Sequence, residues 1–462
     1  MARMTLAYLL IALMITIGLA PMVWEVRQKK FDFFNLKNPF IIYFVIQLGI
    51  SGLITLSIGQ ASEIGLDPVL FYDRYLQALL LSCISLLLFQ IGYYTRRRRA
   101  LVLPQIIRRP WGRNRHVTVF LVCSLAGFSA FALLLAANGG ISEFLANREA
   151  FRAGGMIGQG VFIFPATSMI TTAALVYFLG TVRAKPKRSV ALAIIMLALA
   201  ITPAYFMGFR SAIALPVLQF MVAWRYGYRS ISSGKLAALL IVIAAGFTLY
   251  GFSREIPEGV SVNAVVATEI LVENPELIYT VFSRSKGTEV VASVINTLSQ
   301  TGEFEFGWRS IIEAATILIP RAIFEDKPMA SSQRFTTYFF GETLALARGV
   351  DLETWGGISP TVVGELYWHF GFIGVFVGLF FMGRLASVAY FTLLKNLSNP
   401  SVIVIYSICF TTFVMFAEAI QGYFNAFVMY VPLLLIIFSY LGVRLRYTQR
   451  FAPASVVGSP VK

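Results

Sequence analysis

The sequence is poor in charged side chains. Only 13% of its 462 residues are Asp, Glu, Lys or Arg, whereas soluble globular chains have about 25%. Hydrophobic residues make up 57%, and the mean hydropathy is +0.74. So few charges cannot cover the water-facing surfaces of the soluble domains that this length would otherwise provide. We therefore predict a membrane protein with many spans.

Histidine and cysteine are scarce as well. His116 and His369 are the two histidines, which argues against a metal site built from several imidazoles. Cys83, Cys123 and Cys409 all lie in apolar runs, and no CxxC pair occurs, so neither a disulfide framework nor a zinc site is indicated. The chain also lacks GxxxxGK, HExxH and a dinucleotide fingerprint after a strand, so we predict no nucleotide cofactor and no metal.

Basic residues outnumber acidic ones by 38 to 23, for a formal net charge of +15. They cluster at the ends of apolar runs, for example at residues 96–99, and are not gathered on one polar domain. Such clusters set membrane topology and contact anionic lipid. We therefore predict contact with membrane lipid and no binding of nucleic acid.

The apolar runs predict about eleven transmembrane helices, since each needs about 20 apolar residues to cross the hydrocarbon. The first run is long and has no clear cleavage site, so we interpret it as a retained span. The seventh is the weakest, because Arg210 and Arg225 shorten it. The predicted spans cover residues 5–24, 39–60, 72–94, 117–137, 161–181, 189–207, 211–228, 236–252, 361–383, 401–418 and 424–443.

The charges predict which side each connection faces. One set of alternating connections carries a net charge of +23, whereas the rest of the chain carries −8. The positive-inside bias places the first set in the cytoplasm, so the N-terminus faces outward and the C-terminus inward. The cytoplasmic set comprises residues 25–38, 95–116, 182–188, 225–235, 384–400 and 444–462.

One outer segment, residues 253–358, is 106 residues long. A structureless loop of that length is uncommon, and the segment has apolar periodicity of its own. We predict a helical subdomain at the outer membrane–water interface. The predicted architecture is an all-α membrane bundle with spans one to eight in residues 1–252, this loop, the last three spans in residues 359–443, and a tail in residues 444–462.

Arginines recur in the segments predicted to face outward. Arg148 and Arg152 are spaced i, i+4, so one helical turn would direct both guanidinium groups the same way. An arginine near the hydrocarbon costs about 2.5–3.5 kcal/mol on insertion scales, and guanidinium groups match phosphate oxygens well. This favours a bound phosphate, although snorkelling and pairing with nearby glutamates are the alternative. The candidate cations are Arg148, Arg152, Arg210, Arg254, Arg284, Arg321 and Lys327.

The ninth span begins with features of a helix start. Ser359 is predicted as the N-cap and Pro360 as part of the first turn. Glycines at 356 and 357 precede them, and such a helix N-terminus can accept an anion. A capped helix start without a ligand is the alternative.

Glu365 and His369 follow on one helix face, again spaced i, i+4. An acid at that depth needs a partner or a water-filled cavity. We predict that Glu365 acts as a base toward a sugar hydroxyl, with His369 as the second candidate. A structural pairing of Glu365 with a His or Arg is the alternative. Glu418 and Gln421 are expected near the same cavity.

Together these patterns resemble the Wzy-type polymerases of bacterial surface polysaccharide, such as O-antigen and enterobacterial common antigen polymerases. The resemblance covers roughly residues 30 to 440 and rests on the order of several short motifs. They are Asn-Arg-x-x-x-Arg-x-Gly (147–154), Gly-x-Arg-Ser (208–211), Ile-Pro-Arg…Lys-Pro (319–328), Ile-Ser-Pro-Thr-x-x-Gly-Glu (358–365) and Phe-Gly-x-x-Gly (370–374).

The resemblance implies an inner-membrane glycosyltransferase with its N-terminus in the periplasm and its C-terminus in the cytoplasm. It would move a growing glycan from undecaprenyl diphosphate to the non-reducing end of a new lipid-linked repeat unit. The transfer would be inverting and metal-independent, without a cofactor, and the arginines would hold the diphosphate. A chain-length regulator and a flippase are the implied partners.

Two alternatives share this architecture. An O-antigen ligase would use the same donor, but the related ligases place a key histidine in the long outer loop, and residues 253–358 contain none. A transporter or flippase of lipid-linked oligosaccharides should show internal repeats and midplane charges, and the sequence shows neither. A purely structural role would leave the outer arginines unexplained.

Overall fold

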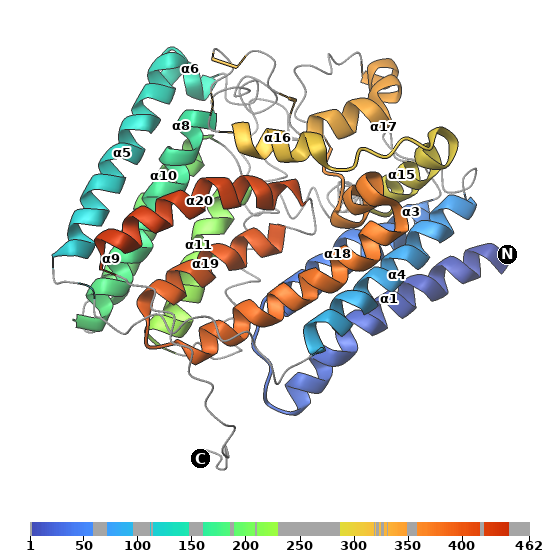
Figure 1. The fold of residues 1–462 in the computed structure, drawn as a ribbon, viewed down its shortest axis with the longest axis horizontal. Coiled ribbons are helices and arrows are strands. Elements are labelled where there is room, and N and C mark those ends of the chain that lie inside the picture. Colours follow the sequence, from blue (N-terminus) through green and yellow to red (C-terminus); the bar gives the residue numbers. More distant parts are fainter. Residues whose placement is uncertain are drawn as a thin grey trace, which may run out of the picture.

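The structure, a computed structural model, consists of helices and their connections throughout the part of the chain that it describes (Figure 1). This confirms the all-α prediction for that part. The described residues are 2–58, 72–95, 111, 114–146, 160–184, 189–207, 210–229, 287–317, 319, 323–324, 328–329, 331–348, 358–415 and 420–442.

The helix bounds follow the hydrophobic runs closely, because a backbone surrounded by lipid must satisfy its hydrogen bonds within a helix. Two short segments, η1 and η3, are π-helical. The elements are α1 (Ala2–Arg27), α2 (Lys37–Phe44), η1 (Val45–Ile50), α3 (Ser51–Ile58), α4 (Tyr72–Tyr94), α5 (Arg115–Ala137), α6 (Ile141–Ala146), α8 (Gly160–Phe164), η3 (Pro165–Met169), α9 (Ile170–Ala184), α10 (Ser189–Met207), α11 (Arg210–Gly227), α15 (Gly287–Thr301), α16 (Trp308–Thr316), α17 (Ser331–Arg348), α18 (Val362–Lys395), α19 (Pro400–Met415) and α20 (Gln421–Tyr440).

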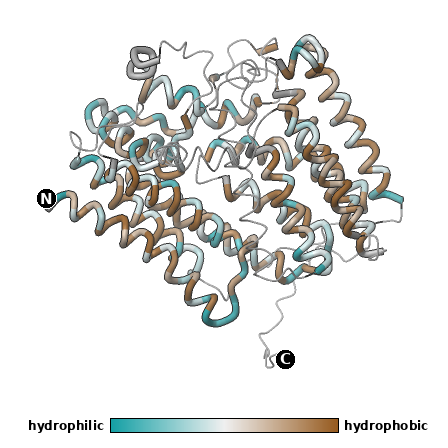
Figure 2. The backbone as a smooth tube through the Cα atoms, turned by 180° about the vertical axis from the view of Figure 1, so that it is seen from behind, coloured by the Kyte–Doolittle hydropathy of each residue, from teal (hydrophilic) through white to brown (hydrophobic). Residues whose placement is uncertain are grey.

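Seven of these helical stretches are long and apolar enough to cross a membrane, and two shorter apolar helices accompany them. Figure 2 shows hydrophobic residues along the long helices and hydrophilic residues at their ends. The chain is therefore a multi-pass membrane protein. Helix α11, at the seventh predicted span, is not among the seven, and the predicted eighth span (236–252) lies outside the described residues. The total of about eleven spans stays a prediction.

Helix α18 differs from the predicted ninth span in length and shape. It runs to Lys395, twelve residues beyond the predicted end, and it is broken at Gly371, whose φ is 61° and ψ is −151°. Because the break removes helical donors, the carbonyl oxygens of Trp368 and His369 accept the backbone N–H groups of Glu305 and Phe306, both at 3.2 Å. The break thus attaches the segment between α15 and α16 to α18.

The N-cap of α18 also differs from the prediction. Thr361, not Ser359, caps the helix, since its hydroxyl accepts the N–H of Gly364 at 3.1 Å. Pro360 consequently precedes the helix instead of occupying its first turn. Thr361 has a φ of 58°, and the observed N-cap lies two residues beyond the predicted one.

Helices α4 and α18 make the closest contact of the bundle. A methyl group added at Gly92 would collide with the Phe380 carbonyl, and one at Gly383 would collide with the Phe89 carbonyl. Small residues allow such backbone-to-backbone packing in membrane helices. The region of α18 around residues 380–383 is thereby packed directly against α4.

The long segment predicted to face outward contributes α15, α16 and α17, which gather where α18 begins (Figure 1). The apolar periodicity of this segment lies at residues 265–272, 290–298, 311–319 and 335–346. The last three stretches overlap these helices, whereas the first lies outside the described part. Residues 287–295 of α15 are buried almost continuously, and the Thr288 hydroxyl donates to the Leu48 carbonyl of η1 at 2.5 Å. Helix α15 is therefore part of the bundle core and is not an amphipathic surface helix.

Helix α16 has the reverse polarity of a water-facing helix. It buries Ser310 and Glu313, while the side chains of Trp308, Ile311 and Ile312 are 66%, 47% and 44% exposed. An apolar outer face is expected where a helix contacts lipid, and a buried polar face needs polar partners inside the protein.

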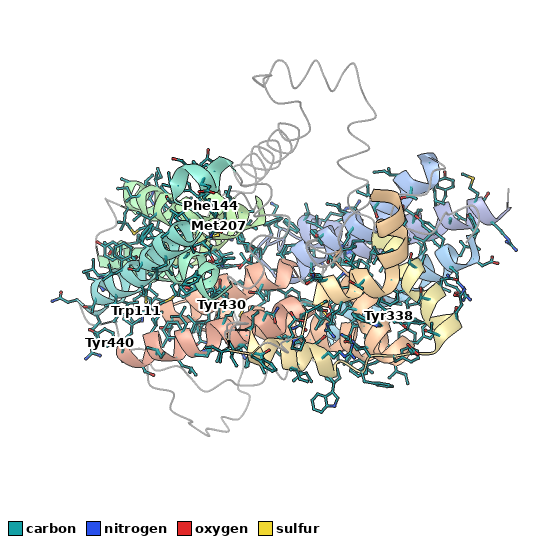
Figure 3. All side chains as sticks on the ribbon, turned by 90° about the horizontal axis from the view of Figure 1, so that it is seen from above. Trp111, Phe144, Met207, Tyr338, Tyr430 and Tyr440 are labelled. Carbon is teal, nitrogen blue, oxygen red and sulfur yellow. The ribbon has the colours of Figure 1, made fainter. Side chains whose placement is uncertain are left out.

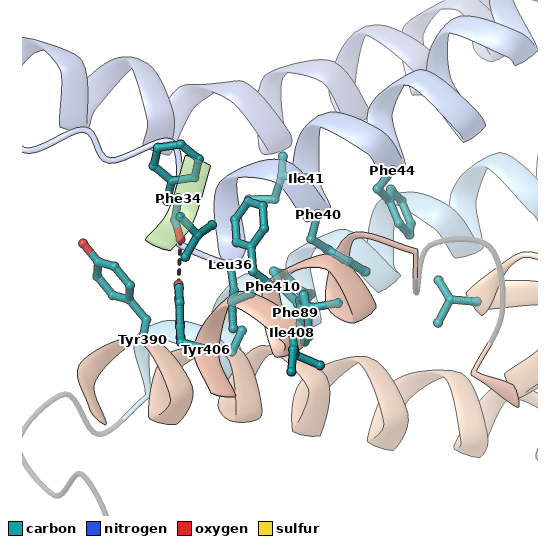
Figure 4. Close-up of a cluster of buried hydrophobic side chains, with 14 of the residues drawn as sticks. Phe34, Leu36, Phe40, Ile41, Phe44, Phe89, Tyr390, Tyr406, Ile408 and Phe410 are labelled. Atoms are coloured by element: carbon teal, nitrogen blue, oxygen red, sulfur yellow. Dashed lines mark hydrogen bonds between the residues drawn. The ribbon is translucent and has the colours of Figure 1, made fainter. Parts of the chain in front are cut away.

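Side chains fill the interior between the helices (Figure 3), and a cluster of buried aromatic and aliphatic side chains packs α2, α4 and α19 together (Figure 4). There the Tyr406 hydroxyl donates to the Phe34 carbonyl at 2.6 Å. Asp32 accepts hydrogen bonds from the hydroxyls of Tyr226 and Tyr390, at 2.6 and 2.9 Å. These contacts join α11, α18 and α19 to the turn after α1.

Candidate functional site

The structure describes three of the predicted site residues completely: Ser359, Glu365 and His369. Arg210 begins α11, and its side chain lies outside the described part. Residues outside the described part altogether are Arg148, Arg152, Arg254, Arg284, Arg321, Lys327 and Glu418.

Glu365 and His369 belong to a buried group of polar side chains that we call the acid–arginine cluster. It lies at the start of α18 and takes residues from α16, α17 and α20 as well as from the segment before α16. Its members are Glu305, Ser310, Glu313, Arg334, Glu365, His369 and Gln421.

Arg334 of α17 is the cation of the cluster, and the sequence analysis missed it. Its guanidinium group pairs with Glu305, lies 3.8 Å from the Glu313 carboxylate and donates to the Ser310 hydroxyl at 3.3 Å. The Arg334 side chain is only 10% exposed, and it also lies 5.9 Å from the centre of the Trp368 ring. A buried arginine needs such partners, and its position after three polar residues at the start of an apolar helix was the available signal.

His369 lies between two carboxylates. Its Nδ1 is 3.4 Å from Glu305 Oε2, and its Nε2 is 3.8 Å from Glu365 Oε1. The first of these contacts does not meet hydrogen-bond geometry. The ring stacks on Trp368 with centroids 5.2 Å apart. The predicted i, i+4 proximity of Glu365 and His369 is present, within a larger group of charges.

Glu365 holds the beginning of α20. Its carboxylate accepts the backbone N–H of Ile420 and, at 3.1 Å, that of Gln421. The residue is 1% exposed. Charge-assisted hydrogen bonds to the first N–H groups of a helix are strong, so Glu365 joins α18 to α20. This is a structural role of the kind weighed in the sequence analysis, although the partners are backbone groups.

Glu313 of α16 has the electrostatic character expected of a proton-transfer group. Burial raises the pKa of its carboxyl group to about 7, although Arg334 and hydrogen bonds from Asn425 and the Ser331 backbone oppose the rise. The nearby charge of Glu365 contributes to the increase. A carboxyl group that titrates near neutral pH can accept or donate a proton under cellular conditions.

Two cavities flank the cluster. The first, which we call the arginine cavity, has a volume of about 520 Å³ and is lined by Arg309, Arg334 and four apolar residues of α16 and the segment after it. The second, the neutral cavity, has a volume of about 420 Å³ and lies among η3, α11, α19 and α20. Ser359, a predicted site residue, lines the neutral cavity.

The cluster connects the two cavities through specific side chains. Arg334 lines the arginine cavity and lies 3.8 Å from the Glu313 carboxylate, whereas Asn425 lines the neutral cavity and lowers the pKa of the same carboxyl group. Gln421 supports this arrangement, since its amide donates to the Ser310 carbonyl at 3.0 Å and to Asn425 Oδ1 at 2.9 Å. Glu313 therefore lies between a cationic and an uncharged compartment.

Metal ligation is not indicated in the described part of the chain, where no group of three or more His, Cys, Asp or Glu side chains has the geometry to hold an ion. The helix lengths and hydropathy define a multi-pass helical membrane protein. Comparison with protein-family models, with curated proteins and with solved structures gives no match to this chain.

Proposed function

We propose that the chain polymerises undecaprenyl-diphosphate-linked oligosaccharide repeat units at the periplasmic face of the bacterial inner membrane. The observation that carries this proposal is the buried acid–arginine cluster between a cationic cavity and a neutral one. The cluster lies where the helices of the long segment predicted to face outward meet α18 and α20. The proposal includes about eleven spans, a periplasmic N-terminus and a cytoplasmic C-terminus.

The arginine cavity has the chemistry of a lipid diphosphate site. Arg309 and Arg334 supply guanidinium groups, and Ile312, Phe324 and Met329 supply apolar surface. Guanidinium groups bind phosphate oxygens through paired hydrogen bonds, and the apolar lining suits the adjoining polyprenyl chain. Arg321 and Lys327 lie outside the described residues, and they stay predicted ligands of the diphosphate.

The reaction is an inverting glycosyl transfer. A hydroxyl oxygen of the acceptor sugar bonds to the anomeric carbon of the donor, and the bond from that carbon to the diphosphate oxygen breaks. The arginines stabilise the negative charge that develops on the departing lipid diphosphate, and a carboxylate takes the hydroxyl proton. No nucleotide is consumed, because the lipid diphosphate is itself the leaving group.

Glu313 is the better-suited proton acceptor among the buried carboxylates. Burial raises its pKa to about 7, whereas both oxygens of Glu365 accept backbone N–H groups of residues 420 and 421. In this proposal Glu365 and His369, the predicted catalytic pair, position α20 and the carboxylates around Glu313.

The test is an in vitro reaction with the purified chain in nanodiscs. Its substrate is a repeat unit linked to undecaprenyl diphosphate from the host, and nucleotide is left out of the mixture. We expect a ladder of longer lipid-linked glycans, unchanged by EDTA. Arg309→Gln and Glu313→Gln should remove the ladder. Arg229→Gln should retain it, because Arg229 is an exposed arginine that follows the C-terminal end of α11.

The alternatives predict other products. An O-antigen ligase would leave the repeat unit unextended and would transfer it to added lipid A. A flippase would form no new glycosidic bond, and its loss would leave single repeat units inside the cell. If the wild-type protein binds the lipid-linked repeat unit but never elongates it, the proposed polymerase activity is refuted.

A further inference from the structure

The neutral cavity is lined by several uncharged polar side chains, which a space filled by lipid chains would not need. Its lining includes Ser168, Gln219, Thr412, Asn425 and Tyr430, and the lining residues that the structure describes include no Asp, Glu, Lys or Arg. Tyr430 is labelled near the middle of the molecule in Figure 3. Uncharged hydrogen-bonding groups inside a membrane bundle are costly unless partners or a ligand satisfy them.

Some of these groups pair with one another and hold the cavity open. The Tyr430 hydroxyl donates to the Ser168 hydroxyl at 2.9 Å, and the Gln219 amide donates to Thr411 Oγ1 at 2.8 Å. Each amide or hydroxyl has more donor and acceptor positions than one such bond uses. The lining can therefore bind a ligand that both donates and accepts hydrogen bonds.

The aromatic residues restrict the ligand further. The rings of Phe164 and Tyr430 meet edge to face, with centroids 5.5 Å apart, and both rings line the cavity. A sugar presents C–H faces to aromatic rings and hydroxyl groups to amides, so it uses both parts of this lining. A diphosphate would find no cation among the described lining residues, and a polyprenyl chain would leave the remaining hydrogen-bonding positions of the lining amides and hydroxyls unused.

We infer that the neutral cavity binds the non-reducing end of an uncharged glycan, with Asn425 placing the acceptor sugar beside Glu313. The volume of about 420 Å³ is within the range of small-molecule sites. The inference rests on the proposed function for the origin of the glycan. It adds a second substrate compartment, separate from the arginines, to the site in which transfer occurs.

Two probes test the inference on the full chain in nanodiscs. The first is the host repeat-unit oligosaccharide released from its lipid by mild acid and freed of phosphate, detected by saturation-transfer-difference NMR. The second is undecaprenyl diphosphate without sugar, detected by its competition with the lipid-linked substrate. We expect saturable binding of both probes to the wild-type protein.

Ala426→Phe fills the neutral cavity, which Ala426 lines, and should weaken oligosaccharide binding by at least about tenfold while lipid diphosphate binding is retained. The matched control is Ala126→Phe on the exposed face of α5, which should change neither. Ser332→Ala combined with Thr412→Val removes two lining hydroxyls without filling space. This double variant should also weaken oligosaccharide binding, and it replaces Ala426→Phe in the test if the phenylalanine prevents folding.

Three outcomes would overturn the inference. The first is that the phosphate-free oligosaccharide fails to bind a wild-type protein that binds lipid diphosphate, in which case the proposed function survives alone. The second is that the cavity variants bind the oligosaccharide normally while Arg309→Gln loses it, which would place the sugar in the arginine cavity. The third is that undecaprenol without phosphate displaces the oligosaccharide, which would make the neutral cavity a lipid site. Failure of both probes to bind would also remove the proposed function.

Discussion

The carboxylate of Glu365 accepts the backbone N–H of Gln421 at 3.1 Å, and this contact joins the beginnings of α18 and α20 across the interior of the bundle. The same end of α20 carries Asn425, which lines the neutral cavity and lowers the pKa of the Glu313 carboxyl group. The residue that the sequence predicted as the catalytic base therefore positions a wall of the proposed sugar compartment.

Loss of the Glu365 carboxylate should destabilise the protein. Glu365→Ala leaves the N–H groups of Ile420 and Gln421 buried without an acceptor, at a cost of about 2–4 kcal/mol. Glu365→Gln should cost less, because its amide oxygen still accepts a hydrogen bond. Thermal unfolding of the purified variants measures both effects, and Glu143→Gln, at an exposed acid, is the control. Equal stability of the Ala variant and the wild type would contradict the structural role.

Glu313 should make stability depend on pH. Burial raises the pKa of its carboxyl group from 4.5 to about 7, so between these values the folded chain holds a proton that the unfolded chain releases. The contribution of Glu313 is fully present below pH 4.5 and is lost as the pH rises through about 7. Melting temperatures across this range should fall with pH less steeply in Glu313→Gln than in the wild type. Identical pH profiles would show that Glu313 titrates in its ordinary range.

Substitutions of the two arginines that line the arginine cavity should differ in their effects on stability and on ligand binding. Arg334→Gln leaves Glu305 and Glu313 without their buried cation and should lower stability by about 3–5 kcal/mol. Arg309 is exposed, so Arg309→Gln should leave stability unchanged and weaken lipid diphosphate binding. Unfolding and binding assays on the same preparations distinguish these outcomes. A large loss of stability in Arg309→Gln would contradict the assignment.

Gly371 should not tolerate a side chain. Its φ of 61° and ψ of −151° belong to a region that is essentially restricted to glycine, and other residues pay about 1–3 kcal/mol there. Gly371→Ala should therefore lower the melting temperature and the folded yield. Gly422→Ala is the matched control, since a methyl group there meets nothing within 4 Å. A normal melting temperature for Gly371→Ala would indicate that α18 is not broken at this residue.

The exposed face of α16 should contact lipid. Trp308, Ile311 and Ile312 are exposed, whereas Ser310 and Glu313 face the protein interior. In vesicles that contain brominated phospholipid, the fluorescence difference between the wild type and Trp308→Phe should be quenched. The same difference should resist a water-soluble quencher. Strong quenching from water alone would place this face in solvent and contradict the predicted interfacial position.

The sequence by itself predicted the seven long and two shorter apolar helices that the structure describes, because hydrophobic length is a local property. Its predicted bounds of 72–94 and 189–207 coincide with α4 and α10. The i, i+4 spacing that brings Glu365 close to His369 is local in the same sense. Helices within the long segment were also evident from their apolar periodicity, although the periodicity of α16 did not show that its polar face is the buried one.

Only the tertiary structure decided how the charges are paired. Glu305, Glu313 and Arg334 belong to three elements that meet after folding, and no spacing along the chain relates them to Glu365. The same reason explains the break at Gly371, since the N–H groups that satisfy the Trp368 and His369 carbonyls come from residues 305 and 306. The burial of α15 likewise depends on α4 and η1. Partners that are distant in sequence decide the environment of a charge, and that environment decides its chemistry.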